Sequence, residues 1–429
     1  MRAIFLCQWF EPEPNNIRGL PLAAWLSRRG YQVKVLTGFP NYPGGKVYPG
    51  YQIRLRQWEQ IDGVSVLRVA MYPSHDNSTV RRIANYTSLA LSAAALGALL
   101  IGGGDVGFVY HPPATLGLPA IVLKAFRRIP FVYHVADMWP DEVVESGMVG
   151  TGLAKKFVGK ALSLWCNFVY RQAAALTVLS PGFKDMLVQA GVPSEKIHII
   201  YNWADDAVYR PLPRDAALAE QLGFQGRFNV VYAGNMGPFQ ALESVIRAAV
   251  ILQCEPAIQL VMVGTGLKAA ELKALAREAG ATNVRFLEQR PYREMPMINS
   301  LADVLLVHLK DLPLMGVTIP GKTQISLASG RPILMGVRGD AAELIRRAGA
   351  GLICEPENPS ALAQAIMEMY RMPKPQLEEM GAKGRAYYLN QLSLDIAGEK
   401  MDSIFREIMK GKQSRLPKLS THGHPPIDL

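Results

Sequence analysis

The residues from Thr318 to Leu344 combine a helix start, a lysine and a glycine-rich turn in a pattern that suits a phosphate group. The sequence Ile-Pro-Gly at 319–321 predicts an extended approach, because proline fixes its own φ and pushes its predecessor out of the helical region. Lys322 and Thr323 then open a helix, whose first N–H groups have no partner within it. A helix start beside a lysine favours a phosphate. We therefore interpret Lys322 and the N–H groups of Thr323 and Gln324 as a candidate phosphate site; an ordinary surface lysine is the alternative.

Two glycine-containing loops follow predicted strands in the same half of the chain. Gly234 and Asn235 begin a Gly-Asn-Met-Gly sequence, and Gly264 and Gly266 flank a threonine. Glycine lets the backbone approach a ligand closely, so both loops are candidate nucleotide contacts. A plain turn would have the same sequence, and a single Gly-x-Gly is a weak signal.

Composition indicates an ordered protein with an anionic partner. The chain has 429 residues, 49% of them hydrophobic and 19% charged, with 46 basic against 36 acidic side chains. This length predicts about two or three domains. A net charge of +10 suits a nucleotide diphosphate or anionic lipid. The basic residues are scattered without an aromatic–basic motif, which argues against nucleic acid. Four cysteines without a Cys-x-x-Cys spacing predict reduced core residues in a cytoplasmic protein.

Predicted strands and helices alternate through two series, which favours an α/β fold with parallel sheets. The first series begins with a strand at 3–7, a helix at 19–29 and a strand at 32–37; a hairpin is expected to turn at Asp62 and Gly63. The second series begins with a strand at 229–232. Doubly wound sheets bind ligands beyond the carboxyl ends of their strands, which is where the candidate loops fall.

Two segments of the first half raise the question of a membrane. Residues 85–104 carry no charge, and their length alone permits a spanning helix, but small residues dominate them and a predicted core strand follows at once. We therefore expect a buried or membrane-surface helix. Residues 154–171 predict a basic amphipathic helix. It could lie on an anionic bilayer or be an ordinary core-facing helix with a solvated basic face.

These residues and motifs together resemble the GT-B glycosyltransferases of family 4, in the branch that builds bacterial capsule, O-antigen and colanic-acid-type polysaccharides. The resemblance spans about residues 1–408 and implies two doubly wound, Rossmann-like domains that face each other across a cleft. We expect an acceptor-binding domain at 1–202 and a nucleotide-sugar-binding domain at 203–385. A helix at 386–410 is expected to return to the first domain, and residues 411–429 to form a disordered tail.

The resemblance also implies roles for individual residues. Gly19, with the loop 15–18, corresponds to the loop that covers the reaction centre, and Asp137 matches an Asp at the cleft edge; both are candidate catalytic residues. Arg290 is expected to face the same cleft, and Glu343 to bind the ribose or base. The alternatives are that Asp137 caps a turn, that Arg290 is an exposed loop residue and that Glu343 interacts only with the helix dipole.

The chain departs from the family pattern at several positions. The two glutamates of a Glu-x7-Glu motif fall on Val317 and Ile325, and basic residues that bind diphosphate in many members fall on Asn235 and Gln240. A common histidine falls on Ala136. The donor phosphates are therefore expected to depend on Lys322, Arg290 and backbone N–H groups, and no catalytic base is identified.

The resemblance implies a retaining glycosyltransferase that moves a sugar from a nucleotide-sugar, with UDP the expected nucleotide. The expected acceptor is a polyprenyl-diphosphate-linked saccharide at the inner face of the cytoplasmic membrane, which makes an anionic membrane surface a further partner and the enzyme a peripheral one. No metal or other cofactor is expected, because the sequence lacks the Asp-x-Asp motif of metal-dependent enzymes. The alternatives are a UDP-sugar 2-epimerase on the same scaffold and a non-catalytic scaffold subunit.

Overall fold

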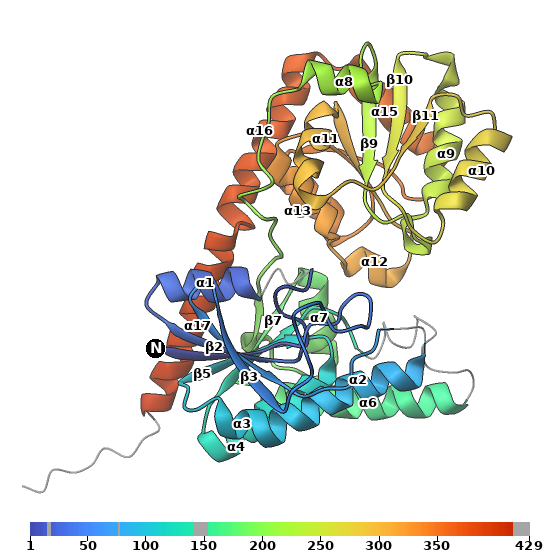
Figure 1. Cartoon of the computed structure of the whole chain (residues 1–429). Coiled ribbons are helices and arrows are strands. Elements are labelled where there is room, and N and C mark those ends of the chain that lie inside the picture. Colours follow the sequence, from blue (N-terminus) through green and yellow to red (C-terminus); the bar gives the residue numbers. More distant parts are fainter. Residues whose placement is uncertain (15–18, 76–77, 140–152, 415–429) are drawn as a thin grey trace, which may run out of the picture. The chain divides into compact units, whose positions relative to one another are not determined.

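The computed structural model describes residues 1–14, 19–75, 78–139 and 153–414. The chain divides into two compact units. Unit 1 contains Met1–Leu176 and the residues from Glu399 onward, and unit 2 contains Thr177–Gly398. Figure 1 labels many of the helices and strands of both units.

An eight-stranded sheet organises the first part of the chain, in the order β3-β4-β2-β1-β5-β6-β7-β8. From β4 to β6 neighbouring strands are parallel, and β3 pairs antiparallel with β4. The predicted hairpin is confirmed, since Asp62 and Gly63 both have positive φ between these two strands. The strands are β1 (Arg2–Leu6), β2 (Gln32–Thr37), β3 (Arg56–Ile61), β4 (Val64–Val69), β5 (Val106–His111), β6 (Phe131–Val135), β7 (Ala175–Val178) and β8 (Ile197–Ile199).

Helices cover this sheet because its central strands are apolar on both faces. The π-helical segment Ala93–Gly97 continues α2 into α3 and packs on β2 and β4, while α1 packs on the same two strands. Figure 1 shows α1 and α17 on one side of the sheet and α2, α3, α4 and α6 on the other. The helices are α1 (Leu20–Arg28), α2 (Thr79–Ser92), α3 (Ala98–Leu100), α4 (Gly117–Arg127), α6 (Leu153–Gln172) and α17 (Leu394–Ser414).

The last helix belongs mainly to unit 1. The hydroxyl of Tyr31 donates a hydrogen bond to Asp402 on α17, and its ring lies 6.2 Å from that of Phe405. The helix begins only at Leu394, because the hydroxyl of Ser393 accepts from an N–H of its first turn. It also runs through Ser414, past the expected start of a disordered tail at 411. The rest of that tail, residues 415–429, lies outside the described part of the chain.

Unit 2 contains a six-stranded sheet in the order β11-β10-β9-β12-β13-β14, and every neighbouring pair is parallel. The register aligns Val263 with Ala233 and with Leu287, so three strands end at one edge. The strands are β9 (Phe228–Ala233), β10 (Ile258–Val263), β11 (Val284–Leu287), β12 (Val304–His308), β13 (Ile333–Gly336) and β14 (Gly351–Ile353).

Helices surround this sheet and enclose the cores of unit 2 on both of its faces. They are α8 (Ala216–Leu222), α9 (Leu242–Ile251), α10 (Ala269–Glu278), α11 (Met295–Leu301), α12 (Pro313–Val317), α13 (Gly321–Ser329), α14 (Asp340–Ala348), α15 (Pro359–Arg371) and α16 (Lys374–Gln391). The remaining helix of unit 2, α7 (Pro181–Gln189), packs on β8 and on α12.

By contacts the chain divides at 176/177 and at 398/399, but β8, which ends at Ile199, still belongs to the eight-stranded sheet, so the expected domain boundaries at 202/203 and 385/386 stay predictions. Unit 2 begins at Thr177 because the start of α7 is bonded within it. The Ser180 hydroxyl donates to the Val317 carbonyl at 2.6 Å, and the Gly182 N–H donates to the Asp340 carboxylate at 2.7 Å. It ends at Gly398, since α16 packs on α13 and α14. Residues 386–391 of the expected returning helix therefore belong to unit 2.

One buried cation ties together the edge of the unit 1 sheet. The Arg68 side chain is fully buried on β4, and its Nε lies 2.5 Å from the Glu59 carboxylate on β3. Its other nitrogens donate to the carbonyls of Gly38, at 2.8 Å, and of Glu11. These carbonyls lie in the loops that follow β2 and β1. One guanidinium thus fixes two strands and two loops.

We expect Arg68→Met to destabilise unit 1 by about 3–5 kcal/mol, because it leaves a mostly buried carboxylate and two carbonyls unpaired. The measurement is urea unfolding followed by tryptophan fluorescence. Arg56→Met is the matched control, since Arg56 is exposed on β3 and its loss should change the free energy of unfolding by no more than about 0.5 kcal/mol. Equal unfolding midpoints for the two variants would contradict this role.

Candidate active site

Two glycine loops meet at the carboxyl edge of the unit 2 sheet. The N–H of Gly234 donates to the Val263 carbonyl at 2.9 Å, and the N–H of Met236 donates to the Thr265 carbonyl at 2.8 Å. Gly264 has a φ of 132°, and a Cβ there would lie 2.2 Å from the Gly234 carbonyl oxygen. The two loops therefore pack backbone against backbone, which requires glycine and leaves a narrow, main-chain-lined edge.

Lys322 reaches this edge from the first turn of α13. Its Nζ lies 3.6 Å from the centroid of the Tyr232 ring and donates a hydrogen bond to the Tyr232 hydroxyl, which in turn donates to the Asn235 carbonyl at 2.5 Å. A Cβ on Gly234 would lie 2.6 Å from Lys322 Cε. Burial lowers the pKa of Lys322 to about 7. The structure therefore brings Lys322, Gly234, Asn235, Gly264 and their loops together.

Tyr232 is a site residue that sequence reasoning missed. It occupies a buried position in the middle of an apolar strand and reads as an ordinary core aromatic. Its hydroxyl lies where the strand meets the glycine loop, so it can accept a hydrogen bond from the Lys322 amine. Nothing in the local sequence pattern distinguishes this tyrosine from a purely structural one.

Thr323 differs from the expectation that its N–H faces a phosphate. That N–H donates to the Pro320 carbonyl at 2.8 Å, and the Thr323 side chain is fully buried with no hydrogen-bond partner for its hydroxyl. The side-chain amide of Gln324 also donates to the Pro320 carbonyl, at 2.9 Å. The first turn closes on the proline carbonyl, so the remaining candidate donors are the N–H groups of Gly321 and Lys322.

Arg290 and Glu343 are held by neighbours on their own segments. Arg290 follows β11 at the carboxyl edge and lies 3.9 Å from the Glu294 carboxylate, with its side chain partly exposed. Glu343 bonds both Arg346 and Arg347 on α14, and these two arginines lower its pKa. The structure thus places Arg290 at the expected edge but shows Glu343 engaged by its own helix.

His308 holds the loop that begins at Gly234, and the sequence analysis did not predict this role. Its Nε2 accepts the Glu357 N–H at 3.2 Å, so Nδ1 carries the proton and donates to the Gln240 carbonyl at 2.8 Å. Burial lowers its pKa, and the charge of Lys322 adds to this effect. A neutral histidine therefore fixes the end of the loop that begins at Gly234.

In unit 1, Asp137 closely follows a sheet strand, and Gly19 directly precedes a helix. Asp137 follows β6, is half-buried, and has its pKa raised to about 6 by burial. Gly19 is buried at the start of α1, where its carbonyl accepts the Ala23 N–H at 3.0 Å. The loop 15–18 that was grouped with Gly19 lies outside the described residues. A carboxyl that titrates near neutrality suits contact with a sugar hydroxyl.

Glu11 is a second carboxyl of this kind, and the sequence did not single it out. It follows β1, and N–H groups of Glu11 and Leu20 bond its carboxylate, which places it at the first turn of α1. Burial outweighs these bonds and raises its pKa to about 7, and its Oε2 is buried without a hydrogen-bond partner. Neighbouring Glu13, by contrast, accepts three backbone N–H groups and fixes the loop.

Four half-buried rings cluster around the carboxyl ends of β1, β2 and β4. Trp9 lies 5.1 Å from Tyr42 and 6.5 Å from Tyr86, and His75 lies 4.6 Å from Tyr42, measured between ring centroids. Flat aromatic faces provide large apolar contact area with polar edges, which suits the C–H face of a sugar. The sequence analysis did not predict this aromatic cluster (Trp9, Tyr42, His75 and Tyr86), because its members lie far apart in the sequence.

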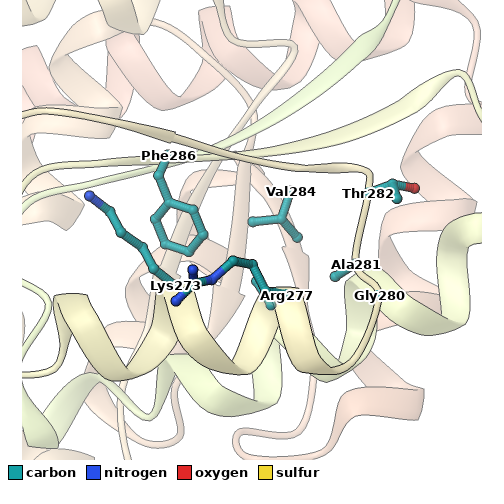
Figure 2. Close-up of a pocket in the computed structure, with 8 residues that line it drawn as sticks. Lys273, Arg277, Gly280, Ala281, Thr282, Val284 and Phe286 are labelled. Atoms are coloured by element: carbon teal, nitrogen blue, oxygen red, sulfur yellow. The ribbon is translucent and has the colours of Figure 1, made fainter.

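A hollow elsewhere in unit 2 is not part of this arrangement. Figure 2 shows Lys273 and Arg277 of α10 beside Phe286 and Val284 of the edge strand β11. The hollow extends to Gly280 and Thr282, which precede that strand. It therefore lies toward the amino end of β11, whereas Lys322 and the glycine loops lie at the carboxyl edge of the sheet.

Comparisons with known proteins agree with this geometry. Residues 18–203 match the "Glycosyl transferase 4-like domain" family, and residues 227–372 match "Glycosyl transferases group 1". The chain is 27% identical to the putative colanic acid biosynthesis glycosyl transferase WcaI of Escherichia coli, over 82% of this chain and 88% of the relative. It is 26% identical to the probable glycosyltransferase WbjE of Pseudomonas aeruginosa, over 71% and 75%. The structure of Anabaena HepE in complex with UDP and glucose superimposes with a TM-score of 0.66 at 18% identity, over 96% of this chain and 99% of that one.

Two parallel-sheet, Rossmann-like units with a lysine and glycine loops at the strand ends define a GT-B fold. Both family matches, together with the two relatives, identify the catalytic class as glycosyl transfer. The chain belongs to family 4 of the GT-B glycosyltransferases and acts in polysaccharide biosynthesis.

The lowered pKa of Lys322 predicts that binding of an anionic diphosphate takes up a proton. Near pH 8 the unliganded amine is mostly neutral, and a bound diphosphate favours the ammonium, so a nucleoside diphosphate should bind with uptake of up to about one proton and more weakly as pH rises above about 7. Calorimetry in two buffers of different ionisation enthalpy measures this. Lys322→Arg, which stays charged, should abolish the uptake. Identical enthalpies in both buffers for the unmodified enzyme would contradict the prediction.

Proposed function

We propose that this enzyme is a retaining, metal-independent glycosyltransferase that moves a sugar from a UDP-linked donor to a polyprenyl-diphosphate-linked saccharide. The observation that carries the proposal is the position of Lys322. Its amine lies among the glycine loops at the carboxyl edge of unit 2, which is where a doubly wound sheet binds its ligand.

The donor assignment is supported by the chemistry of that edge. A nucleoside diphosphate carries its charge between nucleoside and sugar, and it becomes the leaving group. Lys322 and the N–H groups of Gly321 and Lys322 at the start of α13 supply a cation and dipoles for it. HepE, which shares the fold, was solved with UDP. The main-chain lining at Gly234 and Gly264 allows the close approach that a diphosphate requires.

Metal independence is proposed because a protein cation takes the place of a metal. The sequence has no Asp-x-Asp motif, and the amine beside Tyr232 becomes a full ammonium when the diphosphate binds. It then neutralises charge that develops as the bond from the anomeric carbon to the phosphate oxygen breaks.

Retention is proposed from family membership and from the weak candidates for a base. The acceptor hydroxyl oxygen bonds the anomeric carbon on the face that the diphosphate leaves, and its proton passes to the departing phosphate oxygen. Asp137 and Glu11 then position the acceptor hydroxyl by accepting a hydrogen bond from it. Both carboxyls titrate between about 6 and 7, so the ionised form needed for this is available near neutrality.

A lipid-linked saccharide acceptor is proposed for unit 1. The aromatic cluster offers ring faces to a sugar, and Gln8 places an unpartnered buried amide oxygen beside the cluster's loop. Glu11 and Asp137 follow other strands of the same sheet. This combination of ring faces and hydrogen-bond acceptors is suited to a saccharide with exposed hydroxyls.

The direct test is transfer from a panel of UDP-sugars to polyprenyl-diphosphate-linked saccharides in EDTA, with the product anomer read by NMR. We expect one donor to be consumed, with its anomeric configuration kept. Lys322→Met should lower kcat/KM by about 100- to 1,000-fold, because a cation at the leaving group is lost. Lys383→Met, at an exposed position on α16, is the matched control and should have no effect. Hydrolysis or epimerisation without an acceptor, or transfer that requires a divalent metal, would reject the proposal.

The raised pKa values of Asp137 and Glu11 predict an acidic limb in the pH profile. If ionised carboxylates hold the acceptor hydroxyl, kcat/KM should fall as pH drops through about 7 and about 6. Glu11→Gln and Asp137→Asn should each lower kcat/KM and remove one inflection. The profile of kcat/KM against pH measures this; a limb that persists unchanged in both variants would show that another group titrates.

A further inference from the structure

Three adjoining helical segments on one side of the unit 1 sheet contain no acidic residue, and α1 on the other side contains none either. By sequence, neither Thr79–Leu100 (α2, its π-helical continuation and α3) nor α4 nor α6 includes an Asp or Glu. The same helices carry basic residues at Arg81, Arg82, Lys124, Arg127, Lys155, Lys156, Lys160 and Arg171. Solvated helix faces normally mix both signs, so this bias needs an explanation beyond solubility.

These helices form one layer on the sheet. Helix α4 contacts both α2 and α6. The Arg127 guanidinium at the end of α4 donates to the Leu99 carbonyl of α3 at 3.1 Å, and the Lys124 amine donates to the Gln172 carbonyl of α6 at 2.7 Å. Figure 1 shows the layer on the side of the sheet opposite α1 and α17. We call its outer surface the acid-free face.

Large apolar side chains on the acid-free face are exposed. On α6 the exposed side chains of Phe157, Leu164 and Phe168 recur at helical spacing, so they form one stripe along that helix. Phe126, at the end of α4, is 82% exposed. The remaining members lie along α2 and α3, at Val80, Ile83, Leu91 and Leu99. Single exposed apolar residues are normal, but a set aligned along adjoining helices indicates an interaction surface.

The helix Thr79–Leu100 is long and apolar enough to cross a membrane by length and composition, and 39% of its most apolar window is buried. One side of this helix packs against the interior of unit 1. Leu89, Ala90 and Ala93 are buried, and the buried Asn85 accepts from the Gln8 amide at 2.9 Å and donates to the Tyr72 carbonyl at 2.7 Å. A helix that is fixed on one side and apolar on the other lies along a surface.

We propose that the acid-free face docks on an anionic bilayer surface, with Phe126, Phe157 and Leu164 at the level of the headgroups and acyl boundary. Charge complementarity selects this occupant. Basic side chains on helices that include no acidic residue are attracted to anionic lipid, and the apolar stripe adds burial that a soluble polyanion would not supply. The inference concerns binding and does not depend on which sugar is transferred.

The same helix connects this face with the aromatic cluster. Tyr86 of α2 belongs to the cluster, and the Arg82 guanidinium lies 3.4 Å from the Tyr86 hydroxyl. The exposed side chains of Val80 and Ile83 occupy the same first turns. If the proposed acceptor is right, docking would hold the cluster at the depth where a lipid-linked diphosphate meets its saccharide.

The test is flotation of the full chain with phosphatidylcholine vesicles that do or do not contain phosphatidylglycerol, without nucleotide or acceptor. We expect binding only to the anionic vesicles, weakened by salt. Phe126→Ser/Phe157→Ser and Lys156→Glu/Lys160→Glu should each weaken it at least about tenfold. The matched controls are Leu55→Ser/Ile251→Ser, at exposed apolar positions off this face, and Lys273→Glu/Arg277→Glu, a basic pair with the same spacing on the hollow of Figure 2.

Several outcomes would overturn the proposal. They are failure of the unmodified chain to bind anionic vesicles, equal binding to neutral vesicles, or equal loss in the control variants. Resistance of the native membrane-bound enzyme to alkaline carbonate extraction would show a spanning helix instead. Circular dichroism and the thermal unfolding midpoint establish that each variant is folded. A transferase that turns over donor but ignores vesicles would reject this inference alone, and a vesicle-binding chain without turnover would reject only the proposed function.

Discussion

The contact of the Lys322 amine, largely removed from water, with the Tyr232 ring is the interaction on which the candidate site of unit 2 depends. Lys322 can occupy this place only because Gly234 has no side chain and because the Tyr232 hydroxyl accepts a hydrogen bond from the lysine amine. The lowered pKa reports the cost of burying the cation without an anion. In the proposed function a diphosphate supplies the missing charge, so the electrostatics that disfavour the buried cation alone would favour the bound ligand.

The arrangement of the surrounding elements follows from that requirement. Parallel register brings the ends of β9, β10 and β11 to one edge, and the backbone contact between Gly234 and Gly264 closes the space between two loops. Neutral His308 holds the far end of one loop without adding a second positive charge. The chain thus lacks several charged residues that are common in the family and relies more on main-chain geometry.

In unit 1, helix α2 contributes Tyr86 to the aromatic cluster and the exposed Val80 and Ile83 to the acid-free face. Arg68 bonds the carbonyls of Glu11 and Gly38 and so fixes the loops that follow β1 and β2. Asn85 links α2 to Gln8, which follows β1. With its inner side anchored in this way, α2 can present apolar residues outward without losing its own position. In the proposals made above, this one anchored helix would serve both membrane contact and acceptor positioning.

The sequence by itself determined the repeating α/β pattern, the hairpin at Asp62, the helix that starts at the Ile-Pro-Gly turn and the placement of glycine loops after strands. These features are local, because periodicity, proline and glycine act within a few residues. Tertiary structure decided the rest. Contacts between residues distant in sequence define the roles of Tyr232, His308, Glu11 and the aromatic cluster. The Thr323 N–H and the Glu343 carboxylate bond nearby groups, and the sequence pattern does not show which of several possible partners each one takes. Hydrogen-bond competition and burial are set by packing in three dimensions, and only the folded chain shows which partner is nearest.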